Sequence, residues 1–160
     1  MVAIADMDLK LKLFMRGYPW RRLDRMSSAG RTKLLAECRV ALVSSAGMVA
    51  PGHSPFNSQV KGGDWSWRSI PAEIDVRSLT EHHSSGFWDH SGIEADRNMG
   101  MPLDRLHQLA ADGAIGEVAP RHISVMGAIT APGRFTRETV PEIAEVLTTD
   151  EVDVALMVPV

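Results

Sequence analysis

The stretch Cys38–Gly47, CRVALVSSAG, decides the fold class of this chain. The residues from Val40 to Val43 are continuously apolar, which is typical of a β-strand covered on both faces. Serine, alanine and glycine follow this run, and they indicate a turn at the carboxyl end of the strand. A strand covered on both faces requires helices on both sides of its sheet, so helices and strands are expected to alternate along the rest of the chain.

Two helices are predicted after this strand. Residues 102–113, PLDRLHQLAADG, have an amphipathic pattern, a proline suited to the first turn, and Gly113 at the C′ position. Residues 139–147, TVPEIAEVL, form the second predicted helix, with Thr139 and Glu142 at the spacing of a capping box.

Three further strands are predicted, and they are separated by long loops. The strands are residues 72–80, 121–129 and 152–158, and the loops are residues 48–68 and 82–100. The alternation predicts an α/β fold with a mostly parallel, doubly wound sheet of the Rossmann or flavodoxin type. No predicted helix follows the final strand, so we expect the architecture to be incomplete at its C-terminus.

Length and composition limit the class of protein. The 160 residues suit one α/β domain, expected over residues 38–160, with an N-terminal arm over residues 1–37. The net charge of −3 gives no basic field for nucleic acid, and no apolar run is long enough to span a membrane. Cys38 is the only cysteine, so an internal disulfide is excluded. The N-terminus does not have the pattern of a signal peptide, and a cytoplasmic protein is expected.

Candidate site residues lie where parallel strands should end. Ser44 and Ser45 follow the first strand, where backbone N–H groups could hold a carboxylate, although a plain turn is the alternative. Arg121 could pair with a substrate carboxylate, with His122 beside it, and a surface ion pair is the alternative there.

The densest polar cluster lies in the loop HHSSGFWDH. Its imidazole and carboxylate groups would suit zinc or iron, which would favour a metal-dependent hydrolase. However, the spacing matches no metal motif, so proton transfer or binding of a substrate carboxylate is the preferred interpretation. The residues concerned are His82, His83, Asp89 and His90.

Several motifs occur together over residues 38–160. They are VALVSSAGM, HSPF, IPAEIDVRSLTEHH, DHSGIEADRNMGMPLDRL, GAIGEVAPRHISVMG and DVALMVPV, in this order. Together they resemble the selenoprotein B family of glycine, sarcosine and betaine reductases, and the related selenoprotein subunit of D-proline reductase. The block that begins with DHSGIEADRNMG is the most specific part of the resemblance.

The resemblance implies that the strand VALMVPV leads directly into a redox-active selenocysteine or cysteine. The catalytic residue is therefore expected immediately after Val160 and not within the chain. If an in-frame UGA codon for selenocysteine were read as a stop codon, the sequence would end at Val160. The alternatives are a natural end and a trimmed chain. In each case the chain by itself is expected to be inactive.

The implied activity is reductive cleavage of a C–N bond in a small amino acid or amine, with a disulfide or selenide–sulfide centre as the redox couple. A pyruvoyl group on a partner subunit would activate the amine, and no cofactor is expected on this chain itself. Other reductase subunits are the expected partners, and the chain could also form a homo-oligomer. A metal-dependent hydrolase and a non-catalytic partner subunit remain as alternative functions.

Overall fold

A computed structural model describes residues 9–18, 29–85 and 89–160. The chain divides into two units, residues 1–30 and residues 31–160. In the first unit, helix α1 spans Leu9–Gly17. The predicted arm, residues 1–37, falls partly outside the described residues.

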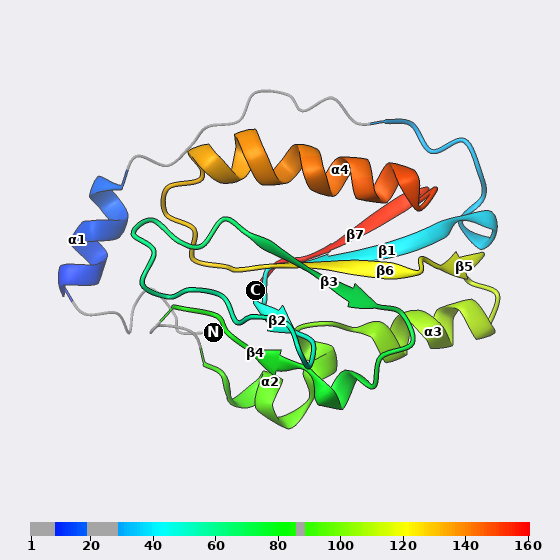
Figure 1. Cartoon of the computed structure of the whole chain (residues 1–160), viewed down its shortest axis with the longest axis horizontal. Coiled ribbons are helices and arrows are strands. Elements are labelled where there is room, and N and C mark those ends of the chain that lie inside the picture. Colours follow the sequence, from blue (N-terminus) through cyan, green and yellow to red (C-terminus); the bar gives the residue numbers. More distant parts are fainter. Residues whose placement is uncertain (1–8, 19–28, 86–88) are drawn as a thin grey trace. The chain divides into compact units, whose positions relative to one another are not determined.

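The second unit is built on a five-stranded sheet organised around β1 (Figure 1). β1 (Arg39–Ser44) pairs in parallel with β7 (Val154–Val158) along one edge. Along its other edge, β1 pairs in parallel with β5 (Glu117–Val118) and then with β6 (Arg121–Val125). β3 (Trp67–Pro71) lies antiparallel to β6. The predicted α/β class with a mostly parallel sheet is therefore confirmed, although the sheet is mixed.

Helices cover both faces of this sheet. α3 (Leu103–Ala111) and α4 (Val140–Thr149) lie on opposite sides of it (Figure 1). Successive side chains of a strand point to opposite faces, so Leu42 joins the core cluster on the α3 side, whereas Val43 packs with Ile143 of α4. The apolar run in β1 is therefore explained by burial on both faces.

The two predicted helices are confirmed, but one predicted cap is wrong. Gly113 has a φ of +71° and directly follows the C-cap of α3, as the sequence predicts. α4 is preceded by a π-helical turn, Phe135–Thr139, so Thr139 already has helical geometry and makes no side-chain cap. The Thr139 hydroxyl instead donates a hydrogen bond to the Trp65 carbonyl, which fastens the long loop to the start of α4.

The strand predicted over residues 72–80 is largely wrong. Asp75 accepts a hydrogen bond from the Arg77 backbone N–H at 3.0 Å and starts a 3₁₀ turn, Val76–Ser78. Only the end of the segment is extended, in β4 (Thr80–Glu81), which pairs antiparallel with β2 (Met48–Val49) in a separate two-stranded ribbon.

The predicted loops also contain ordered structure. β2 and the first residues of β3 lie within the segment 48–68. The segment 82–100 includes α2 (Ser91–Ala95) and a 3₁₀ turn, Arg97–Met99. No helix in the described part of the chain is long and apolar enough to cross a membrane.

Candidate functional site

The parallel strands β1, β6 and β7 all end at one edge of the sheet, which is where α/β proteins usually bind ligands. Ser45 extends the pairing of β1 and β7 beyond the strands themselves. Its backbone N–H donates to the Val158 carbonyl at 3.1 Å, and its Oγ accepts from the Val160 N–H at 2.9 Å. Ser45 therefore holds the backbone of Val160 at this edge.

The neighbouring serine has a different environment. Ser44 is completely buried, and its hydroxyl donates to the Gly100 carbonyl at 2.5 Å. The same oxygen accepts from the Ala46 backbone N–H at 3.1 Å. Of the two predicted serines, Ser44 thus has its hydrogen bonds satisfied within the core, whereas Ser45 lies at the carboxyl edge.

His83 reaches the same edge because two glycines leave room for it. A Cβ on Gly47, whose φ is +68°, would lie 3.0 Å from the His83 backbone nitrogen. A Cβ on Gly127 would lie 2.1 Å from His83 Nε2 and 2.8 Å from the Ser45 carbonyl oxygen. The imidazole therefore occupies the space above Gly127, beside Ser45.

The protonation of His83 follows from its surroundings. Burial lowers the pKa of His83, and the nearby His90 lowers it further, while the charge of Glu81 acts in the opposite direction. The Ser85 backbone N–H donates to Nδ1 at 3.2 Å, so the proton of the neutral ring lies on Nε2. His83 is thus a neutral imidazole at pH 7, with its N–H on the nitrogen nearest the carboxyl edge.

The other members of the predicted His82–His90 cluster have hydrogen-bond partners of their own. His82 Nε2 is 3.1 Å from the hydroxyl of Thr80. Asp89 is exposed and accepts from the Ser91 N–H at 3.0 Å, and hydrogen bonding by Ser91 lowers the pKa of Asp89. His90 pairs with Glu81, a residue that the sequence analysis did not single out.

The described residues also bear on the metal alternative. Among residues 9–18, 29–85 and 89–160, no group of three or more histidine, cysteine, aspartate or glutamate side chains could hold a metal ion. The structure therefore gives no support to the hydrolase alternative.

Arg121 lies at the opposite edge from Ser45 and His83. It begins β6, and its Nε and Nη2 donate to the Asp150 carboxylate at 2.6 and 2.8 Å. The structure therefore supports the alternative of an ion pair and does not bring Arg121 to the carboxyl edge.

His122 lies inside the sheet and is completely buried. Its Nδ1 accepts from the Leu42 backbone N–H at 3.0 Å, so the imidazole replaces a backbone acceptor between β1 and β6. Burial lowers the pKa of His122 to about 4. Pro120, which has no N–H to donate, interrupts the strand just before this point and separates β5 from β6.

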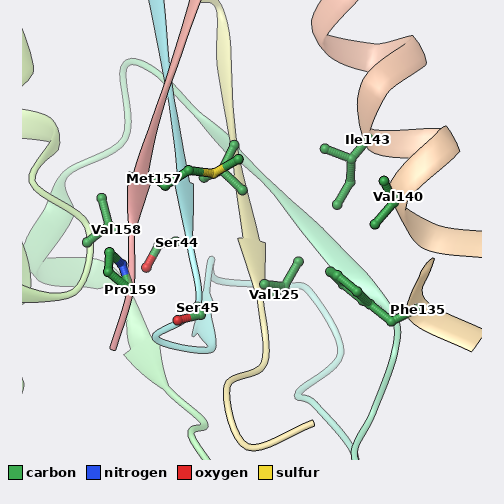
Figure 2. Close-up of a pocket in the computed structure, with 10 residues that line it drawn as sticks. Ser44, Ser45, Val125, Phe135, Val140, Ile143, Met157, Val158 and Pro159 are labelled. Carbon is green, nitrogen blue, oxygen red and sulfur yellow. The ribbon is translucent and has the colours of Figure 1, made fainter. Parts of the chain in front are cut away.

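A pocket of about 300 Å³ opens between α4 and the carboxyl ends of the strands. Figure 2 shows Val140 and Ile143 of α4 on one side and Met157 of β7 on the other, with Phe135 at its end. Its lining is almost entirely apolar, and Ser44 and Ser45 are the polar residue types among its lining residues. The pocket could not be predicted from the sequence, because it depends on how α4 lies over the sheet.

Comparison with known proteins gives consistent results. The model of the family described as glycine/sarcosine/betaine reductase selenoprotein B matches residues 3–159. D-proline reductase subunit gamma of Acetoanaerobium sticklandii is 36% identical over 126 residues, which are 79% of this chain and 50% of that protein. No solved structure matches the chain.

Two further relatives are subunits of related complexes. Glycine reductase complex component B subunit gamma of Symbiobacterium thermophilum is 28% identical over 152 residues, covering 93% of this chain and 34% of that protein. Sarcosine reductase complex component B subunit beta of Peptoclostridium acidaminophilum is 28% identical over 123 residues, which are 75% of this chain and 28% of that protein. The chain thus spans half the length of the first relative, and 34% and 28% of the lengths of these two.

Proposed function

The chain belongs to the glycine/sarcosine/betaine reductase selenoprotein B family, and from this membership we propose that it is a component of a complex that reductively cleaves a C–N bond. The substrate is a small amino acid or amine. The observation that carries the proposal is the match of the family model to residues 3–159. Relatives named as subunits of D-proline, glycine and sarcosine reductases support a role within a multi-subunit complex.

The chemistry requires three events in order. A selenolate or thiolate attacks the α-carbon, and the C–N electron pair leaves on nitrogen, which takes a proton. A second thiol then attacks the selenium or sulfur, and the carbon product leaves with a proton. The selenide–sulfide or disulfide that remains is reopened by a dithiol reductant.

The carboxyl edge suits this chemistry. A chain that continues past Val160 would carry its redox selenocysteine or cysteine at this edge, because Ser45 holds the Val160 backbone there. The Nε2–H of the neutral His83 ring lies at the same edge, where it can donate a hydrogen bond to the substrate without giving up its proton. The pyruvoyl group that the resemblance implies belongs to a partner subunit, where its role is to activate the amine.

The layers around the sheet support the doubly wound arrangement as part of this proposal. α3 and α4 lie on opposite faces, so a ligand at the carboxyl edge would lie between the two helical layers (Figure 1). The pocket beside Ser45 has carbon-rich walls and suits the ring or N-methyl carbons of an amine better than it suits glycine. We therefore propose D-proline or an N-methylated amine as the preferred substrate.

The test is reconstitution of the reductase complex with a form of this protein that includes the redox residue. Dithiol oxidation is measured with D-proline, sarcosine, betaine and glycine in turn. We expect turnover of at least one amine, with D-proline or an N-methylated amine ahead of glycine. Failure to associate with any reductase subunit, together with no turnover of the four amines, would overturn the proposal.

A further inference from the structure

Glu81 and His90 form a carboxylate–imidazole pair near the carboxyl edge. The Glu81 side chain is only 6% exposed, and its Oε1 lies 2.9 Å from His90 Nδ1. A carboxylate removed from water requires a hydrogen-bond donor, and the imidazole supplies one. The His90 side chain itself is 41% exposed, so the ring reaches solvent while its partner does not.

This geometry selects one tautomer of His90. An ionised carboxylate can only accept hydrogen bonds, so the hydrogen of a neutral His90 ring lies on Nδ1. The other nitrogen, Nε2, then carries a lone pair that can take up a proton.

His83 provides the complementary group. Its hydrogen lies on Nε2, because the Ser85 N–H occupies Nδ1. Glu81 and His90 both influence the pKa of His83, in opposite directions, so the three groups share one electrostatic environment. The two imidazoles therefore have opposite tautomers, with the hydrogen on Nε2 in His83 and on Nδ1 in His90.

We propose that Glu81 and His90 form an acid–base pair of this site, in which His90 Nε2 exchanges the proton and Glu81 is the positioning residue. This inference rests on the proposed function for the identity of the substrate. His90 takes one proton from the ammonium group of the arriving amine and returns one as the amine leaves. The pair thus ends each cycle in the protonation state in which it began.

The first test is the reactivity of His90 in the 160-residue chain. Diethyl pyrocarbonate is applied at pH 8, and the rate of modification of each histidine is read by peptide mass spectrometry. Glu81→Gln keeps an oxygen acceptor for Nδ1–H but removes the charge, so we expect the rate at His90 to fall at least threefold. If Glu81 merely held α2 in place, the released ring would react at an equal or higher rate, and that result would overturn the proposal.

A second measurement does not depend on a variant. Nitrogen-15 NMR of histidine-labelled wild-type protein should show neutral His90 as the Nδ1–H tautomer, and the Nε2–H tautomer would contradict the proposal. Glu94→Gln serves as the matched control, because Glu94 is an exposed carboxylate on α2 and its loss should change neither readout. Circular dichroism establishes that each variant is folded.

Activity of the assembled complex separates this inference from the proposed function. Glu81→Gln should lower kcat with little change in KM, and Glu81→Asp should restore part of the loss. An active complex that is unaffected by Glu81→Gln contradicts the acid–base pair alone. A wild-type complex that turns over no amine contradicts the proposed function, while the labelling rate and the tautomer still decide whether the pair exists.

Discussion

His122 fills a place in the sheet that a backbone carbonyl normally takes. Its Nδ1 accepts from the Leu42 N–H, and the ring is completely buried. The pKa of about 4 lies below the ordinary value of 6.5, so the folded protein binds fewer protons than the unfolded chain between these two pH values. Folding stability therefore decreases as the pH falls from about 6.5 to about 4, and this contribution levels off below that range.

The pH dependence of unfolding provides the measurement. The lowered pKa of His122 should reduce the free energy of unfolding by about 3 kcal/mol between pH 7.5 and pH 4. His122→Gln keeps an acceptor for Leu42 but does not titrate, so urea unfolding of this variant should depend less on pH than that of the wild type. His83, whose pKa is also lowered, is present in both proteins and cancels in the comparison. Equal pH profiles would contradict the prediction.

Gly127 makes the position of His83 possible. A Cβ at this residue would overlap His83 Nε2, at 2.1 Å, and crowd the Ser45 carbonyl. We expect Gly127→Ala to displace the imidazole and to destabilise the fold by about 1–3 kcal/mol. Gly133→Ala is the control, because a Cβ there would meet only the end of the Arg137 side chain, at 3.4 Å. The measurements are thermal unfolding and the His83 signals in NMR, and unchanged signals in Gly127→Ala would contradict the prediction.

Strands and helices with strong local patterns could be predicted from the sequence. Three elements follow from patterns of residues that are neighbours in the sequence. They are β1 with its continuous apolar run, α3 with its amphipathic stripe, and the apolar C-terminal strand β7. β3 and β5 were missed, because short polar-containing segments become strands only through pairing with β6 and β1. Their existence depends on partners that are distant in the sequence.

The same distinction applies to the candidate site. Ser45 could be predicted because it follows an obvious strand, and His83 because it stands in a dense cluster of histidines. Glu81 and Gly127 could not, since their roles arise from contacts with His90 and with His83 across the fold. Asp89 belongs to the same cluster in the sequence, and its carboxylate accepts a hydrogen bond from the Ser91 N–H.

α4 forms one wall of the pocket while anchoring the sheet. Ile143 is 8% exposed and packs with Ile123 and Val125, whereas Val140 is 43% exposed. Ile143→Ala should therefore lower the free energy of unfolding by about 2–4 kcal/mol. Val140→Ala should lower it clearly less, although both residues line the pocket. Chemical denaturation measures both costs. Similar losses for the two variants would mean that α4 is not anchored through Ile143.

The two edges of the sheet differ in chemistry. The amino edge is held by ion pairs, including Arg39 with Glu117 at 2.7 Å and Arg121 with Asp150 at 2.6 Å. The carboxyl edge has the pocket, Ser45 and His83 instead. The ion pairs that stabilise the fold therefore lie at one end of the strands. The groups proposed to act on substrate lie at the other end.

This separation predicts opposite effects of two substitutions. Arg121→Gln should lower folding stability by about 1 kcal/mol, because it removes a paired but partly exposed guanidinium, and it should leave turnover of the reductase complex unchanged. His83→Ala should lower turnover at least tenfold, because it removes the Nε2–H hydrogen-bond donor, with a small change in stability. Unfolding curves and dithiol oxidation rates for both variants check the prediction. A loss of turnover in Arg121→Gln would show that the amino edge takes part in the reaction.

β7 is an apolar strand that favours aggregation of the isolated chain. Its residues Val154–Val158 carry no charge, Leu156 and Met157 are 46% and 65% exposed, and β1 is the only described strand with which it pairs. An uncharged apolar border of this kind is a template for stacking of further chains. Concentrated solutions of the isolated chain should therefore deposit thioflavin-positive fibrils, and a lysine in place of Met157 should delay their onset.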